Sequence, residues 1–130
     1  MTSEEMQTIL SKPNNAIVGV NRADGGPQLT PVWFEWDGTS FHFTTTKDRV
    51  KYLNIKRDPS ISLIVDDLEA HKYIAAYGRA EIIEHNVGEL ARPIIQKYTS
   101  GDRLEQMVKM VNNDPNRVLV VLRPDKIVAS

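Results

Sequence analysis

Hydrophobic and polar residues along the chain follow two periods, which together predict a sheet accompanied by a few helices. Stretches of Val, Ile and aromatic residues, alternating with polar residues or running together, are typical of strands. Apolar residues spaced three and four apart are typical of amphipathic helices. The predicted strands cover residues 16–20, 28–36, 40–44, 60–66, 73–83, 117–122 and 126–129. The predicted helices cover residues 3–12, a basic segment that ends at Asp58-Pro59, and residues 86–97 and 102–112.

Turn residues indicate how these elements connect. The Asp37-Gly38 dipeptide is a strong hairpin signal, so we expect the strands on either side of it to pair antiparallel. Pro31 has no N–H to donate, which predicts a sheet edge or a bulge there. Gly78 predicts a bulge or a close backbone contact, and Pro93 predicts a helix kink. The expected fold is α+β: a mostly antiparallel, closed or partly closed barrel of about six or seven strands, with about three or four peripheral helices.

The composition is that of one ordinary domain. With 130 residues, 41% hydrophobic and 25% charged, the chain is long enough to bury a core, and we expect a single domain over residues 1–130. A formal net charge of −1 argues against a general nucleic-acid or membrane-surface binder. The absence of cysteine excludes disulfides, thiolate metal ligands and a cysteine nucleophile. The acidic start lacks a long apolar run, so we expect no signal peptide, no transmembrane helix and a cytoplasmic location.

Positive charge is concentrated in residues 47–57, which hold five of the sixteen Lys and Arg residues and one acid. Lys47, Arg49 and Lys51 fall near the start of the predicted helix, where free N–H groups and the helix dipole favour anions and disfavour cations. The threonines at 44–46 have hydroxyls that donate to oxyanions. A solvated helix face is the plain alternative. The combination favours a phosphate site, although the chain has no glycine-rich phosphate motif.

A second candidate surface lies on the predicted strand 28–36. Residues 31–34, Pro-Val-Trp-Phe, combine a missing ladder donor with large flat side chains. Core packing is the expected role for at least two of Trp33, Phe34 and Trp36, because aromatic residues dominate cores. The hairpin brings this strand beside the threonine run, so a planar ring here and a phosphate at the basic segment fit one ligand.

No catalytic residue stands out in the sequence. The three histidines, His42, His71 and His85, lack the spacing of a metal site, so we expect no bound metal. Nothing resembles a nucleophile elbow or a catalytic triad. A cofactor that carries its own chemistry would account for this.

Several of these residues occur in an order that resembles a known family. The order is Thr30-Pro31-Val32-Trp33-Phe34, the Asp-Gly hairpin, Phe43 with three threonines, Arg49-x-Lys51, Asn54, Lys56-Arg57-Asp58-Pro59, and later Gly78-Arg79-Ala80-Glu81-Ile82. It resembles the pyridoxamine 5′-phosphate oxidase-like split β-barrel superfamily over roughly residues 14–129. Within that superfamily, the short chain and its 49–59 stretch are similar to the small flavin and deazaflavin oxidoreductases that use coenzyme F420.

The resemblance implies a homodimer with two cofactor sites at the subunit interface. It also implies hydride transfer between the deazaflavin and a small unsaturated, carbonyl or quinone-like acceptor. Catalytic residues stay unassigned, with a proton supplied by solvent or by Tyr73 or Tyr77. By position, the phosphate contacts are Thr45, Thr46, Arg49 and Lys51, with Lys47 and Lys56 as additional helpers. The residues expected to line the ring are Thr30, Pro31, Val32, Trp33 and Phe34.

The resemblance leaves two alternatives open. Flavin mononucleotide suits the same phosphate site, because both cofactors place a phosphate on a ribityl-type chain, although five cations favour the longer, more anionic F420. A non-catalytic protein that binds a deazaflavin, a tetrapyrrole or another flat acidic ligand is the second. Pyridoxamine-phosphate oxidase activity itself is not expected, because the chain ends at Ala129-Ser130 without the long basic and aromatic C-terminal portion of those enzymes.

Overall fold

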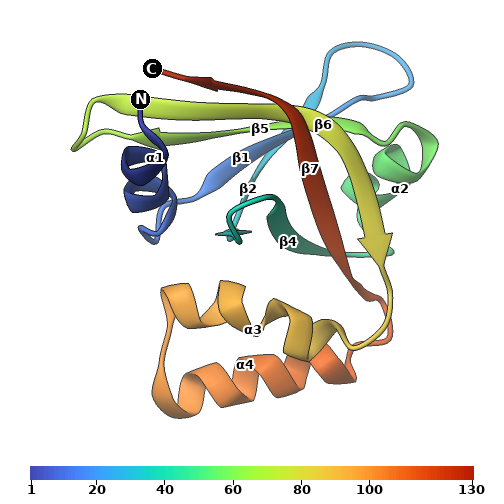
Figure 1. The fold of residues 1–130 in the computed structure, drawn as a ribbon. Coiled ribbons are helices and arrows are strands. Elements are labelled where there is room, and N and C mark those ends of the chain that lie inside the picture. The colour runs from blue at the N-terminus through green and yellow to red at the C-terminus, as the bar shows by residue number, and fades with distance from the viewer.

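The computed structural model describes all 130 residues as one curled antiparallel sheet with four helices (Figure 1). Along the sheet the strands follow the order β2-β1-β5-β6-β7-β4-β3. The strands are β1 (Ala16–Val20), β2 (Gln28–Val32), β3 (Glu35–Trp36), β4 (Phe41–Thr46), β5 (Ser60–Asp67), β6 (Lys72–Ile83) and β7 (Arg117–Ala129). The helices are α1 (Ser3–Leu10), α2 (Val50–Arg57), α3 (Val87–Tyr98) and α4 (Gly101–Asn113). The predicted α+β barrel architecture is confirmed.

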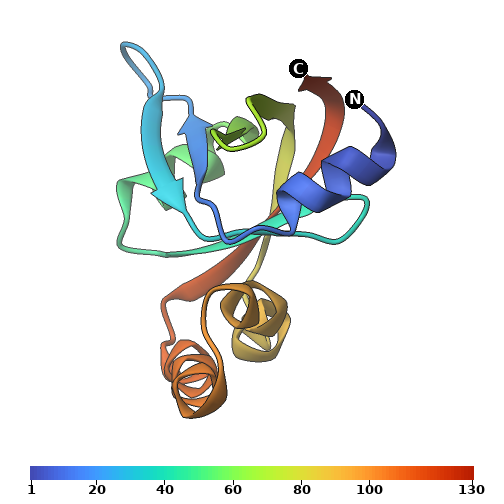
Figure 2. The ribbon, with the colours of Figure 1, turned by 90° about the vertical axis from the view of Figure 1, so that its left-hand side faces the viewer.

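The curled sheet encloses the larger of two hydrophobic cores. Strand β5 illustrates how the sequence builds it, because alternate residues Ile61, Leu63 and Val65 are buried and those between them are not. Helix α1 lies beside the sheet (Figure 2) and adds Ile9 and Leu10 to the same core. The barrel interior is therefore filled with side chains, and any ligand site lies outside it.

Helices α3 and α4 form a pair that stands apart from the barrel (Figures 1 and 2). Strand β7 separates the two cores and is buried on both faces over residues 118–122, which explains its uninterrupted apolar run. Val120 and Leu122 belong to the barrel core, whereas Leu119 and Val121 belong to the core shared with the helix pair. The helix pair is thereby fixed beside β4, the neighbour of β7 in the sheet.

The predicted strand over residues 28–36 is wrong in one respect, because the structure divides it into β2 and β3. Only Glu35 and Trp36 pair with β4 across the Asp37-Gly38 turn, where Gly38 has a φ of 101°. Strand β2 pairs with β1 instead and forms the opposite edge of the sheet. The expectation that Pro31 lies on an edge strand is confirmed. The chain changes direction at the two residues between β2 and β3.

The predicted strands at 117–122 and 126–129 form one continuous strand, β7, which corrects their separation at Pro124. Pro124 pairs with Gly78, and the register of β6 against β7 shifts between Tyr77 and Gly78. This local irregularity accommodates the proline without ending the strand. An added Cβ at Gly78 would lie 2.5 Å from the Arg123 carbonyl oxygen, which explains the glycine. Helix α3 likewise continues through Pro93.

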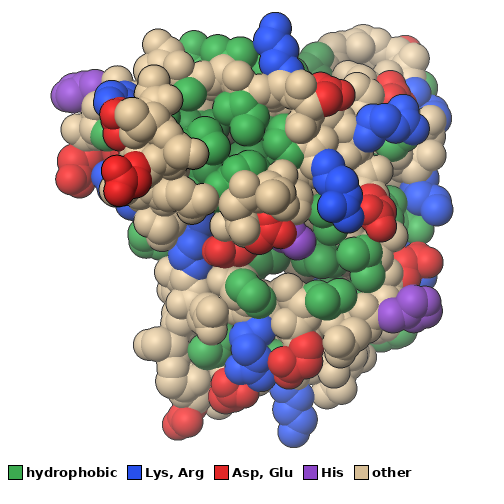
Figure 3. Space-filling model, in the orientation of Figure 1, with side chains coloured by type: hydrophobic (Ala, Val, Ile, Leu, Met, Phe, Trp, Pro, Cys, Tyr) green, Lys and Arg blue, Asp and Glu red, His purple; other side chains and the backbone are tan.

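Positive and negative side chains are interspersed over the face of the molecule in Figure 3. Hydrophobic side chains gather on its upper part and again at the waist between the barrel and the helix pair. None of the four helices is both long enough and apolar enough to cross a membrane.

Candidate cofactor-binding site

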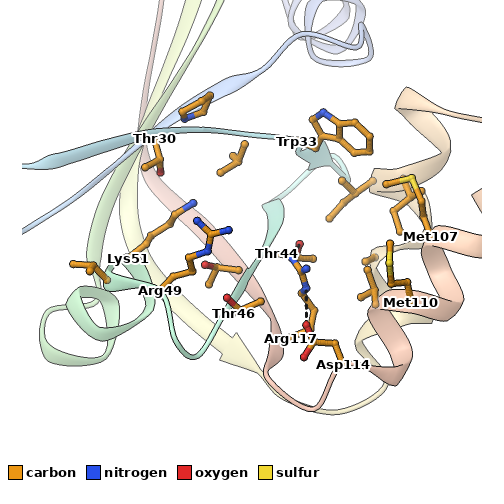
Figure 4. Close-up of a pocket in the computed structure, with 18 of the residues that line it drawn as sticks. Thr30, Trp33, Thr44, Thr46, Arg49, Lys51, Met107, Met110, Asp114 and Arg117 are labelled. Atoms are coloured by element: carbon orange, nitrogen blue, oxygen red, sulfur yellow. Dashed lines mark hydrogen bonds and ion pairs between the residues drawn. The ribbon is translucent and has the colours of Figure 1, made fainter.

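A cavity of about 880 Å³ lies where β2, the end of β4 and the start of α2 face the helix pair (Figure 4). Its volume falls within the roughly 300–1,000 Å³ typical of small-molecule sites. Eight of the eleven cofactor-contact residues predicted from the sequence line it: Thr30, Pro31, Val32, Trp33, Thr45, Thr46, Arg49 and Lys51. The structure thus brings the edge strand and the basic segment to one cavity, as the single-ligand hypothesis requires.

Arg49 and Lys51 supply positive charge to the cavity, and neither forms an ion pair with an acid. Helix α2 starts at Val50, with Arg49 as its N-cap residue and no side-chain hydrogen bond capping its free N–H groups. Neither cation has a carboxylate within 4.0 Å, although both reach into the cavity (Figure 4). Burial, and then the nearby Arg49 charge, hold the pKa of Lys51 below its ordinary value. An anion bound at this point would stabilise the charged form of Lys51 and so offset both the burial and the repulsion from Arg49.

The end of β4 and the start of β7 complete the polar side of the cavity. Arg117 pairs with Thr46 across the sheet and donates from Nη1 to the Thr44 hydroxyl at 3.4 Å. Its buried Nε lies 3.8 Å from the Asp114 carboxylate and makes no hydrogen bond. The Thr46 hydroxyl donates to Asp48. Sequence reasoning missed Arg117 and Asp114, because no local pattern signals that β7 pairs with β4.

Trp33 forms an aromatic wall of the cavity and is held by Tyr98 at the end of α3. The two rings stack with centroids 4.5 Å apart and planes 5° from parallel. The Tyr98 hydroxyl donates to the Asn14 carbonyl at 2.7 Å and accepts from the Phe34 N–H at 3.2 Å. Trp33 is therefore presented to the cavity, with 37% of its surface exposed, on a backbone that α3 anchors.

Three predicted residues do not reach the cavity. The Phe34 side chain is fully buried in the barrel core, with its ring beneath Lys97 Nζ at 3.5 Å, so it is not available to line a ring site. Lys47 pairs with Glu84 at 3.0 Å, away from the cavity. Lys56 is exposed in the last turn of α2, a full helix length from the cluster at Arg49. Tyr73 and Tyr77, the suggested proton donors, are exposed on β6 and do not line the cavity.

Comparison with known families decides what kind of protein this is. The family model for pyridoxamine 5′-phosphate oxidase matches residues 2–129. The chain belongs to this family. The resemblance inferred from the edge strand and the basic segment is therefore confirmed, and the cavity belongs to a pyridoxamine 5′-phosphate oxidase-like split barrel.

Solved structures share the fold of this chain. A structure named F420 reductase is 28% identical, over 94% of this chain and 94% of its own, with a TM-score of 0.76. The conserved hypothetical protein Rv2991 from Mycobacterium tuberculosis is 24% identical over 99% of this chain and 84% of its own, with a TM-score of 0.80. General Stress Protein 26 from Bacillus anthracis str. Sterne is 21% identical over 98% and 92%, with a TM-score of 0.73. The last two show a shared fold.

In this member of the pyridoxamine 5′-phosphate oxidase family, the cavity residues fit a phosphorylated planar cofactor. Two cations without acid partners and a row of uncapped N–H groups suit a phosphate. An exposed, rigidly held indole beside a proline-bearing edge strand suits a flat ring. The site can bind and orient a cofactor, whereas its one acid, Asp114, faces Arg117 and is not placed as a general base.

Proposed function

We propose that this protein is an F420-dependent oxidoreductase that transfers a hydride to a small unsaturated, carbonyl or quinone-like acceptor. The observation that carries the proposal is the pair of cations without acid partners, Arg49 and Lys51, which share a cavity with Trp33. Support comes from the 28% identity to an F420 reductase over nearly the whole of both chains. F420 would supply the hydride carrier, which matches a cavity that has no Cys, His or Ser side chain and whose one carboxylate faces Arg117.

The residues of the chain would act by binding and orientation. Arg49, Lys51 and the N–H groups at the start of α2 would hold the phosphate, with Thr45 and Thr46 beside it. Residues 30–33 would set the plane and depth of the ring. Orientation of two reactants in contact lowers the barrier without a protein acid or base, because it removes translational and rotational freedom beforehand. The proton would come from solvent.

Titration with oxidised F420 tests the proposal, with cofactor fluorescence as the readout. We expect a saturable change at micromolar concentration, followed by oxidation of reduced F420 when an acceptor is added. No saturable change would refute F420 binding. A yellow preparation that retains flavin through purification would favour flavin mononucleotide instead. Binding without turnover over a broad acceptor panel would favour a carrier protein.

The binding of a phosphate-bearing cofactor should depend on pH through Lys51. Its pKa is lowered in the free protein, and a bound phosphate would raise it, so the complex holds more protons than the free protein between these two pKa values. Affinity should be level below the free-protein pKa and fall above it, by up to about tenfold per pH unit. The measurement is the ratio of cofactor Kd values for the parent and Lys51→Arg at each pH, which cancels titration of the ligand. A constant ratio would contradict the role of Lys51.

We also propose that the protein is a homodimer. Ile17 and Ile64 are direct cross-strand partners on β1 and β5. Tyr77 on β6 pairs with Ser62, which lies on the same face of β5 as Ile64. These apolar side chains are 37–44% exposed on one outer face of the sheet, which is typical of an association surface. Sedimentation equilibrium at micromolar concentration should give the mass of two chains. A single-chain mass at that concentration would contradict the proposal.

A further inference from the structure

The cavity has two halves of different chemistry, which face each other in Figure 4. Arg49 and Lys51 enter it from the start of α2, and Met107 and Met110 enter it from α4 on the opposite side. The helix-pair wall consists entirely of side chains that carry no charge and no strong hydrogen-bonding group: Ala91, Ile94, Ile95, Met107, Met110 and Val111. A phosphate accounts for the first half and leaves the second without a function.

Met110 differs from the other residues of this wall. Ala91, Ile94 and Ile95 are buried in the core of the helix pair, and Met107 and Val111 pack partly against that core. Met110 belongs to neither group, and 65% of its surface is exposed although it lines the cavity. The fold therefore does not need its apolar side chain for packing. An unbranched thioether side chain adapts to flat or irregular apolar ligands, which gives Met110 a use at a binding surface.

We infer that the helix-pair wall is a subsite for an uncharged, mostly apolar small molecule, and that Met110 helps to decide which molecules it accepts. A charged group placed here would lose its hydration without gaining a partner, because α3 and α4 present no ionisable side chain to the cavity and Asp114, the C-cap residue of α4, already faces Arg117. Trp33 lies above Met107 (Figure 4), at the junction of the two halves. The occupant would be the hydride acceptor, a role that rests on the proposed function, whereas the apolar subsite itself does not.

The neutral fluorescent probe N-phenyl-1-naphthylamine tests the subsite in the protein without cofactor. We expect saturable binding to the parent, with one probe per chain. Met110→Gln keeps the side-chain length but makes its end polar, so probe affinity should fall about four- to fifteenfold, the loss of one or two buried methylene-sized contacts. Leu90→Gln is the matched control, because Leu90 is an exposed apolar residue on α3 outside the cavity. Its probe affinity should equal that of the parent.

The outcomes separate the subsite from the proposed function. Equal probe affinity for Met110→Gln and the parent, or equal losses in Met110→Gln and Leu90→Gln, would overturn the subsite. Failure of the parent to bind the probe would overturn it as well. If oxidised F420 does not bind but Met110→Gln alone weakens the probe, the subsite stands and the proposed function fails.

Discussion

Phe34→Ala is expected to lower the free energy of unfolding by about 3–5 kcal/mol, the usual cost of truncating a fully buried aromatic residue. The Phe34 ring has no exposed surface, lies 6.1 Å from the Phe41 ring and sits under Lys97 Nζ. Truncation would leave a cavity in the barrel core and remove the cation–π contact. A domain of ordinary stability, about 5–15 kcal/mol, would lose a large part of it.

Urea unfolding of the parent, Phe34→Ala and Phe34→Leu measures this loss. Leucine refills part of the volume, so we expect an intermediate stability. Phe34 differs in this respect from its neighbour Trp33, which is partly exposed and lines the cavity, whereas the Phe34 side chain is buried away from it. If Phe34→Ala left unfolding nearly unchanged but weakened cofactor binding, Phe34 would be a ring contact after all, and its assignment to the core would be wrong.

Lys51→Ala is expected to weaken F420 binding by about 10- to 150-fold, the equivalent of about 1.5–3 kcal/mol for one charge-assisted hydrogen bond. Lys51 is half-buried at the cavity and has no carboxylate partner, and its contact with another charge-accepting group is a distant one, with Nζ 5.8 Å from the centroid of the Phe43 ring. Arg49→Ala should act in the same direction by a smaller factor, because Arg49 is exposed. Fluorescence titration with oxidised F420 provides the dissociation constants.

Lys56→Ala is the matched control on the same helix. It removes the same charge from an exposed position outside the cavity, so F420 affinity should stay within about twofold of the parent. The comparison distinguishes the loss of a local phosphate contact from a weaker overall electrostatic attraction of the anionic cofactor. The free energy of unfolding of Lys51→Ala should stay within about 0.5 kcal/mol, because removal of a desolvated charge offsets the loss of its stem contacts. Equal affinities for Lys51→Ala and the parent would refute the phosphate assignment.

Local sequence signals predicted residues that the structure places on the polar side of one cavity. Lys51 and Arg49 can be singled out from the sequence because the helix dipole disfavours cations at a helix start, wherever the helix lies in the fold. The edge position of Pro31 can be predicted because a residue without an N–H is largely confined to edge strands and bulges. Such signals depend on the chemistry of a few consecutive residues and not on distant partners.

The residues predicted to line the ring show where local reasoning fails. A continuous strand over 28–36 would place Trp33 and Phe34 on opposite faces in simple alternation, but it does not say which face is the core. The break between β2 and β3 decides this, because Trp33 turns to the cavity and stacks on Tyr98 while Phe34 enters the barrel. Tyr98 is distant in the chain, and no pattern around it signals this contact.

The apolar half of the site was not predicted at all. Met107 has the spacing of an ordinary apolar position of an amphipathic helix and does pack on the core of the helix pair, whereas no sequence pattern signals a role for Met110. Their position across the cavity from Lys51 depends on how β7 returns from the helix pair and pairs with β4. This pairing joins segments more than seventy residues apart, so it becomes visible only in the folded chain.

A crystal structure of the complex with oxidised F420 tests the central claim most directly. The account predicts a phosphate oxygen within about 2.7–3.0 Å of Lys51 Nζ or the Arg49 guanidinium, and a deazaflavin ring against residues 30–33 beside Trp33. It would be contradicted by a complex in which the phosphate lies elsewhere and both cations stay free of the ligand.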